Sequence, residues 1–247
     1  MTSERISIEL TNQCGKKCHF CYNHSHPEGK TTWKADEVIN FVKDCANNGT
    51  KAVSFGGGEP LEYPELFTIL QALQGKIFRS LTSNGLLLKG ELLEKLVTAA
   101  PDKVHISLHF PEQKSEVTRV IKQVQQLASL GITSGVNLLV SRSNLSAASQ
   151  AVKQLHHADI GNERIVYLPM RGANTPSSKQ IAQVAQNQPF QSMSCLQFCH
   201  PSARFCSIGW DKTVAWCSYT TARRPLKALT AEALDAALQD LNLIFCG

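Results

Sequence analysis

The sequence lacks any uncharged apolar run long enough to cross a bilayer, and residues 1–10 lack the apolar core of a secretory signal peptide. We therefore expect a cytoplasmic protein without a membrane partner. A strong excess of one charge is also missing, because the 25 Lys and Arg residues are scattered and stand against 20 Asp and Glu residues. For this reason a nucleic-acid surface is not indicated.

What the chain does have is enough apolar material for a hydrophobic core. With 247 residues and a hydrophobic fraction of 43%, it can form one large domain, or one domain plus a small extension. It also has nine cysteines, several of them in clusters with the spacing of metal ligands. In a reducing compartment such clusters favour metal binding over a disulfide framework, and the odd number agrees with this interpretation.

Short β-like runs alternate with amphipathic helical stretches over the first two thirds of the chain. The β-like runs cover residues 6–11, 52–55, 77–82, 104–110, 135–140 and 164–168. Six strand-helix units in succession predict an α/β fold with parallel strands, either an open doubly wound sheet or a partly closed barrel. In both architectures ligands bind at the carboxyl ends of the strands, and the polar motifs of this sequence fall at such ends.

Three cysteines follow the first predicted strand in the spacing C-x3-C-x2-C. They are Cys14, Cys18 and Cys21. Three thiolates on one tight loop can hold three irons of a cubane and leave the fourth iron free to bind a small molecule. A zinc knuckle or a chance cluster is the alternative in a chain so rich in cysteine.

The second predicted strand ends in three glycines followed by Glu59 and Pro60. The glycines let the backbone approach a ligand closely, and a fixed carboxylate beside them can accept hydrogen bonds from a cationic amine. The segment lacks the Lys-Ser/Thr pair of a phosphate-binding loop, which disfavours nucleoside triphosphate binding there. The third strand ends in Thr-Ser-Asn-Gly at residues 82–85, which is also explained as a simple turn.

Polar and apolar residues alternate along the fourth predicted strand. The polar set, His105, Ser107 and His109, shares one face, which we expect to line the interior of the sheet. Ser107 and His109 are candidates for a ligand pocket, whereas a packed core histidine is the alternative for His105. Glu9 on the first strand and Asn137 on the fifth are expected on the same inner face.

Together these motifs resemble the radical S-adenosylmethionine superfamily. The three cysteines correspond to the family's C-x3-C-x-Φ-C motif, with Phe20 at the hydrophobic position. Residues 57–60, Gly57-Gly58-Glu59-Pro60, look like the family's GGEP motif. The resemblance covers Ile6 to about Arg171 and implies a partial (β/α)6 parallel barrel.

The resemblance also implies a cofactor and a reaction. In that family a [4Fe-4S] cluster with an open iron is chelated by S-adenosylmethionine, whose amino group meets the GGEP segment. Residues implied to contact the rest of the cofactor are Ser83, Ser107 and Asn137, although the fifth-strand glycine motif of many members is absent. An electron from a flavodoxin- or ferredoxin-type donor cleaves the cofactor to a 5′-deoxyadenosyl radical, which abstracts hydrogen from substrate.

The C-terminal part is expected to be different in character. We expect a barrel over residues 1–171, a polar connection with one short helix over 172–194, and a small cysteine-rich α+β extension over 195–247. Residues 204–219 read as a β-hairpin that turns at Asp211-Lys212. Cysteines around such a hairpin are similar to the auxiliary-cluster extensions called twitch and SPASM domains.

Five cysteines in this part suffice for one auxiliary [4Fe-4S] cluster. The expected ligands are Cys199, Cys206 and Cys217, with Cys195 or Cys246 as the fourth ligand or with an open iron. The alternatives are a zinc-stabilised hairpin, or free thiols of which one, such as Cys217, donates hydrogen.

The substrate is the least constrained prediction. The chain shows no evident domain for capturing a peptide leader, which favours oxidation or rearrangement of a small molecule, with modification of a ribosomal peptide as the alternative. A non-catalytic iron-sulfur electron carrier or redox sensor is the hypothesis of another class. His109 and Cys217 are the candidate catalytic residues, and Tyr167 is expected near the substrate pocket.

Overall fold

The computed structural model describes residues 3–192, 196 and 199–244 of the chain. These residues form two compact units, the first with residues 3–102 and 200–244 and the second with residues 103–192, 196 and 199. This division differs from the boundaries at residues 171 and 195 that the sequence predicts, because residues after 199 add strands to the sheet of the first unit.

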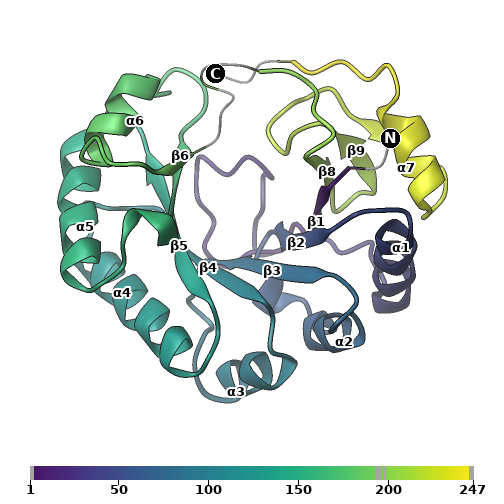
Figure 1. Cartoon of the computed structure of the whole chain (residues 1–247), viewed down its shortest axis with the longest axis horizontal. Coiled ribbons are helices and arrows are strands. Elements are labelled where there is room, and N and C mark those ends of the chain that lie inside the picture. The colour runs from purple at the N-terminus through teal and green to yellow at the C-terminus, as the bar shows by residue number, and fades with distance from the viewer. Residues whose placement is uncertain (1–2, 193–195, 197–198, 245–247) are drawn as a thin grey trace. The chain divides into compact units, whose positions relative to one another are not determined.

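The first unit contains a mostly parallel sheet in the order β10-β9-β8-β1-β2-β3. Its strands are β1 (Arg5–Thr11), β2 (Ala52–Gly57), β3 (Phe78–Ser83), β8 (Cys206–Ile208), β9 (Thr213–Ala215) and β10 (Arg224–Pro225). Its helices are α1 (Ala35–Asn47), the short 3-10 helix η1 (Pro60–Glu62), α2 (Leu66–Ala72), α3 (Gly90–Ala99) and α7 (Ala231–Leu238). Among these strands only the pairings of β9 with β8 and with β10 are antiparallel. Strand β8 lies beside β1 (Figure 1).

Alternating burial explains how the first unit is assembled. Ile6 and Ile8 of β1 are fully buried, and their register partners on β8 are Cys206 and Ile208, which are fully buried as well. The apolar stripe of α1 is also buried, including Cys45, so the prediction that Cys45 packs in the core is confirmed. Strands β1 and β8 and helix α1 therefore all contribute apolar side chains to the core of the first unit.

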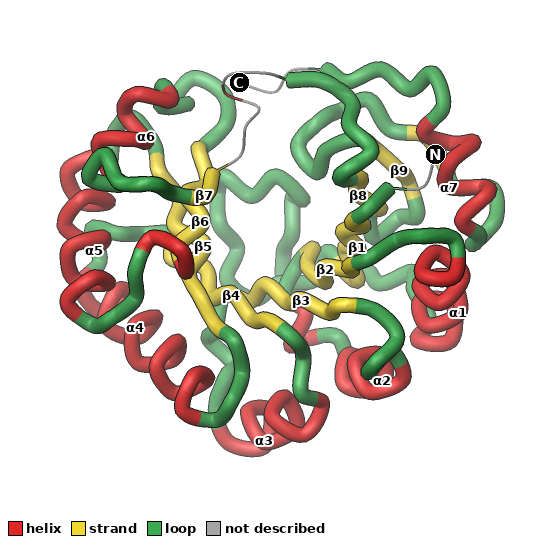
Figure 2. The backbone as a smooth tube through the Cα atoms, in the orientation of Figure 1, coloured by secondary structure: helices red, strands yellow, loops and turns green. Residues whose placement is uncertain are grey.

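The second unit contains four parallel strands in the order β4-β5-β6-β7. They are β4 (Lys103–Leu108), β5 (Ser134–Val140), β6 (Ile165–Pro169) and β7 (Gln191–Ser192). The helices are α4 (Lys114–Ser129), α5 (Leu145–His157), η2 (Asn162–Arg164) and α6 (Ser178–Val184). Within each unit the long helices cover one face of the strands (Figure 2).

The predicted α/β fold with mostly parallel strands is confirmed, and the first six strands lie within two residues of their predicted bounds at every end. The fourth strand ends at Leu108, earlier than predicted, so His109 lies just beyond it. The short helix expected in the connection is α6, and the hairpin turn at Asp211-Lys212 is present, with Lys212 in the left-handed region at φ 61°. Across the described part of the chain, we find no helix with the length and apolar character needed to cross a membrane.

Candidate functional site

A short loop directly after β1 carries the three cysteines of the first motif. Cys14 is buried, whereas Cys18 and Cys21 are partly exposed, and none of the three forms a disulfide with a described residue. The Cys21 amide donates to the Cys18 carbonyl at 3.1 Å, and the Cys14 amide donates to the His26 carbonyl at 3.0 Å. These bonds hold both ends of the motif in one compact loop.

A second loop, which contains the three glycines, packs directly against the start of the cysteine loop. The Gly58 amide donates to the Thr11 carbonyl at 2.6 Å, and the Glu59 amide donates to the Gln13 carbonyl at 2.8 Å. Gly57 has φ 103°, and a Cβ atom on Gly58 would collide with the Gln13 carbonyl. Glycine is therefore required at both positions for the two loops to meet.

Glu59 is the buried acidic residue at this junction, with 1% of its surface exposed. Its carboxylate accepts hydrogen bonds from Ser83 Oγ at 2.7 Å, from the Asn84 amide at 2.8 Å and from the Leu61 amide at 3.1 Å. Burial raises the pKa of Glu59 above its ordinary value, and these donors, which lower the pKa, offset only part of that shift. The carboxylate is consequently fixed in one orientation.

The end of β3 supplies two of those donors. The Ser83 hydroxyl has one proton, which it donates to Glu59. Its oxygen accepts a hydrogen bond from the Gly85 amide at 2.9 Å. This geometry makes Ser83 a support for Glu59. The Asn84 side chain donates through Nδ2 to Cys14 Sγ at 3.7 Å. Sequence reasoning missed Asn84, although its place at a strand end beside two other motifs was a usable signal.

The donor set around Cys14 fits an iron-sulfur cluster. Its sulfur accepts hydrogen bonds from the backbone amides of Lys16 and Lys17 as well as from Asn84. Burial raises the pKa of Cys14, and the two backbone amides lower it. Thiolates that accept N–H hydrogen bonds are the usual ligands of such clusters. Within the described ranges, no three His, Cys, Asp or Glu side chains converge to hold a single metal ion.

The second unit holds the polar residues predicted on β4 and β5. Ser107 and Asn137 are register partners on these strands. His105 Nδ1 lies 2.7 Å from Asn137 Oδ1. Burial and the charge of Lys103 lower the pKa of His105 to about 4, although the bond to Asn137 opposes the shift. His105 is therefore neutral and orients the Asn137 amide; cofactor contacts by Ser107 and Asn137 stay predictions.

His109 follows β4 and lies beside a buried carboxylate. Its backbone amide donates to Glu116 Oε1 at 2.9 Å, and its Nδ1 atom lies 4.0 Å from the same oxygen. The imidazole is 24% exposed, whereas the Glu116 side chain is 7% exposed. The accessible ring leaves His109 a candidate for proton transfer, and its catalytic role stays a prediction.

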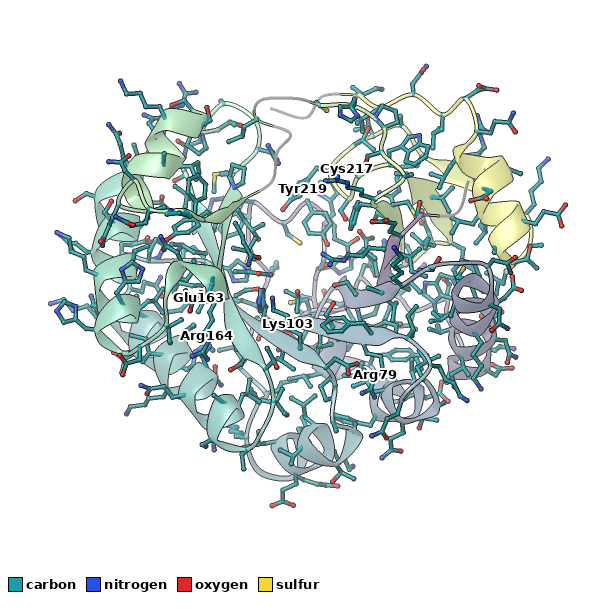
Figure 3. All side chains as sticks on the ribbon, viewed as in Figure 1. Arg79, Lys103, Glu163, Arg164, Cys217 and Tyr219 are labelled. Atoms are coloured by element: carbon teal, nitrogen blue, oxygen red, sulfur yellow. The ribbon has the colours of Figure 1, made fainter. Side chains whose placement is uncertain are left out.

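The C-terminal cysteines lie in different surroundings. Cys206 is fully buried near Cys45, and burial raises the pKa of each of these thiols to about 12. Cys217 is partly exposed, and its sulfur accepts from the Tyr219 amide at 3.5 Å (Figure 3). Cys199 is a residue of the second unit. Cys195 and Cys246 lie outside the described residues, so the predicted auxiliary ligand set stays a prediction.

Tyr167 does not line a pocket as the sequence suggested. The residue is fully buried, and its hydroxyl donates to Asn162 Oδ1 at 2.5 Å. Its ring packs edge-to-face on Phe190 with centroids 5.5 Å apart. Because every part of the side chain has a packing or hydrogen-bonding partner, Tyr167 belongs to the core of the second unit.

A family model described as the radical SAM superfamily matches residues 8–138. Curated relatives include a probable GTP 3′,8-cyclase of Methanocella arvoryzae, 30% identical over 137 residues, or 52% of this chain and 44% of that protein. Another is a probable GTP 3′,8-cyclase of Sulfolobus acidocaldarius, 29% identical over 67% of this chain and 56% of that protein. The chain thus spans about half the length of the curated relatives it matches.

Solved structures share the fold at low sequence identity. Streptococcus suis SuiB bound to its precursor peptide SuiA has a TM-score of 0.75 and 14% identity, covering 94% of this chain and 64% of that one. Native anSMEcpe with bound AdoMet and the Cp18Cys peptide has a TM-score of 0.69 and 13% identity, covering 95% of this chain and 82% of that one. At these identities the likeness describes the fold alone.

Proposed function

The chain belongs to the radical SAM superfamily, and we propose that it cleaves S-adenosylmethionine reductively to begin hydrogen abstraction from a small-molecule substrate. The observation that carries this proposal is the junction of the two loops in the first unit. There Asn84 bonds to Cys14 with its side chain and to Glu59 with its backbone amide. A cluster loop and a carboxylate suited to an amino group are thus joined at one place.

Each residue of the junction has a proposed part. Cys14, Cys18 and Cys21 would hold a [4Fe-4S] cluster, and Glu59 would accept hydrogen bonds from the amino group of S-adenosylmethionine. Gly57 and Gly58 keep that carboxylate close to the cysteine loop. When bound, the cluster and S-adenosylmethionine supply one-electron chemistry that yields a 5′-deoxyadenosyl radical.

The number of electrons that the reaction consumes indicates which redox partner the protein needs. Each reductive cleavage consumes one electron, so the proposal requires an external low-potential donor, of the flavodoxin or ferredoxin type. For the substrate, the curated relatives are named for a reaction of GTP, which favours a small molecule. The peptide-bound neighbours share only the fold, and the substrate class is therefore an outcome that the experiment must decide.

A second cluster in the C-terminal part is also proposed. Its support is the density of cysteines there, since Cys195, Cys199, Cys217 and Cys246 remain when Cys206 is assigned to the core. Four thiolates are the number that one complete [4Fe-4S] cluster takes. This set replaces Cys206, whose burial beside Cys45 favours packing.

The first test is cofactor cleavage by the protein reconstituted anaerobically with iron and sulfide. With dithionite and S-adenosylmethionine we expect slow formation of 5′-deoxyadenosine, measured by mass spectrometry. Cys18→Ala should lose both the N-terminal cluster and the product, whereas Cys45→Ala, which removes a buried core thiol, should retain both. A fully loaded wild-type protein that neither cleaves nor binds S-adenosylmethionine would overturn the proposal.

The substrate class is tested by measuring the same product, 5′-deoxyadenosine, in the presence of candidate substrates. Candidate small molecules should increase 5′-deoxyadenosine formation above the rate without substrate and should themselves change in mass. Conversion of a peptide with no response to small molecules would instead assign the chain to the peptide-modifying class. Mass spectrometry of both substrate pools separates these two results.

A further inference from the structure

Asn84 occupies the position where the cysteine loop meets the end of β3. The residue is buried, with 7% of its surface exposed. Its Nδ2 atom lies 3.7 Å from Cys14 Sγ, within hydrogen-bonding range for sulfur, and its backbone amide donates to Glu59 Oε2 at 2.8 Å. One residue therefore touches both the cysteine loop and the fixed carboxylate.

The orientation of the Asn84 amide is set by a neighbouring backbone group. Asn84 Oδ1 accepts a hydrogen bond from the Leu86 amide at 2.8 Å. A backbone N–H is a donor only, so the atom facing Leu86 must be the amide oxygen, and the NH2 group faces the sulfur. The contact with Cys14 is for this reason an N–H donor pointing at a cluster ligand.

Two carboxylates near Cys14 disfavour negative charge on its sulfur, and the Asn84 donor opposes their effect. The carboxylates of Glu59 and Glu62 lie close enough to oppose negative charge on the sulfur, whereas the Lys16 and Lys17 amides favour it. The Asn84 donor adds to the favourable side. Hydrogen bonds to the sulfur ligands stabilise the more negative, reduced state of an iron-sulfur cluster and raise its reduction potential.

We propose that Asn84 is a positioning residue that raises the reduction potential of the N-terminal cluster through its N–H···S bond to Cys14. This inference rests on the proposed function, because it takes Cys14 as a cluster ligand. The step concerned is the transfer of one electron from the external donor to the cluster, in which no covalent bond forms or breaks. The higher potential lets a weaker donor reduce the cluster.

The two contacts of Asn84 can be separated by mutation. Substitution of the side chain removes the bond to Cys14 but leaves the backbone amide that donates to Glu59. Asn84→Ala removes the whole side chain, and Asn84→Asp keeps an oxygen for Leu86 while losing the NH2 group. Ser80→Ala is the control, because it removes a 3.3 Å bond from Ser80 of β3 to the Val53 carbonyl of β2, which involves no cysteine.

The experiment is a redox titration of each reconstituted protein, followed by the EPR signal of the reduced cluster, with iron content determined first. We expect more negative midpoint potentials in Asn84→Ala and Asn84→Asp than in wild type, and no shift in Ser80→Ala. The dissociation constant of S-adenosylmethionine in Asn84→Ala should stay within about twofold of wild type, because Glu59 keeps its backbone donor.

Unshifted potentials in loaded Asn84→Ala and Asn84→Asp proteins would overturn the inference. A weakened affinity for S-adenosylmethionine at unchanged potential would overturn it too, since Asn84 would then act on Glu59 alone. Should Asn84→Ala not fold, Asn84→Leu, which is similar in size and adds no charge, decides by its potential, because the charge of Asn84→Asp alone would also lower it. A wild-type protein that takes up no iron at the N-terminal motif would instead contradict the proposed function, and the iron determination distinguishes that case.

Discussion

Glu59 shows, at the scale of a single residue, how hydrogen bonds hold a buried carboxylate in place. Burial alone would favour its protonated form, and the donors from Ser83, Asn84 and Leu61 oppose that effect. Two of these donors are backbone amides, and the third is the hydroxyl of a residue on β3. Loss of one donor should therefore change both the charge and the orientation of the group proposed to meet S-adenosylmethionine.

Ser83→Ala tests this arrangement. We expect the affinity for S-adenosylmethionine to fall roughly tenfold, since a hydrogen bond to a charged group contributes about 1.5 kcal/mol. Isothermal titration calorimetry on the reconstituted protein measures the change. Ser80→Ala, which removes a hydroxyl from the same strand, should bind as wild type does. Equal affinities for both variants would contradict the supporting role of Ser83.

Glu9 on β1 is a second buried carboxylate, with 3% of its surface exposed. Burial raises its pKa from an ordinary 4.5 to about 7, while the charge of Arg223 opposes the shift. A folded-state pKa above the unfolded value means that the folded state binds the extra proton. The resulting stability is fully present below pH 4.5 and is lost as the pH rises through 7.

For Glu9→Gln we expect this part of the pH dependence to disappear. The free energy of unfolding of the apo wild-type protein should fall, relative to the variant, by on the order of 3 kcal/mol between acidic and alkaline pH. Urea unfolding at several pH values measures the difference, with the exposed Glu94→Gln as the control substitution. Parallel curves for wild type and Glu9→Gln would contradict the raised pKa.

At the scale of secondary-structure elements, the C-terminal hairpin is part of the first unit. Besides the pairing of β8 with β1, Trp33 Nε1 donates to the Gly209 carbonyl at 3.2 Å. Lys212 Nζ lies 2.8 Å from Glu37 Oε2 and 5.2 Å from the centroid of the Trp33 ring. The hairpin is thus attached to the segment that begins α1.

Helix α7 is attached to α1 by a separate contact. Asp44 Oδ2 accepts from the Ala231 amide at 2.6 Å, so a carboxylate of α1 meets the N-terminus of α7. For Asp44→Ala we expect a loss of about 1 kcal/mol in the free energy of unfolding, because the amide loses its acceptor and the helix dipole loses its anion. Urea unfolding is the measurement, and Asn47→Ala on the exposed side of the same helix is the control. Equal stability of the two variants would contradict the contact.

The sequence predicted local features better than pairings between distant segments. Alternation along β1 and β4 and the apolar stripe of α1 depend on neighbouring residues, so these elements were identified correctly. The pairing of β8 with β1 depends on contacts between distant segments and was missed. Cys206 was predicted among the cluster ligands from its spacing, which gives no sign that it lies near Cys45, and its ligand role stays a prediction.

In the candidate site, the motifs were visible but their hydrogen bonds were not. The cysteine spacing and the glycine run identify the two loops from local sequence. That the Ser83 proton goes to Glu59, and that Asn84 reaches Cys14, depends on side-chain geometry at the ends of neighbouring strands. Such details follow from the sheet register, which a single sequence does not specify.

For the molecule as a whole, the nine cysteines separate into classes with different expected iron content. After full reconstitution, about eight irons per chain would support the second cluster, and about four would contradict it. We expect Cys206→Val to leave the iron content unchanged, because that thiol packs against the core, and Cys217→Ala to lower it. Iron and sulfide analysis per chain decides; a loss of iron in Cys206→Val would return that residue to the ligand set.

The pairing of β1 with β8 also bears on the order in which the chain matures. Ile6 leaves the ribosome early, whereas its partner Cys206 is translated roughly 10 to 40 s later at ordinary elongation rates. Residues 103–199, which make up nearly all of the second unit, are synthesised in the meantime. Until β8 arrives, one edge of β1 is a strand without a neighbour, exposed to chaperones and to other nascent chains.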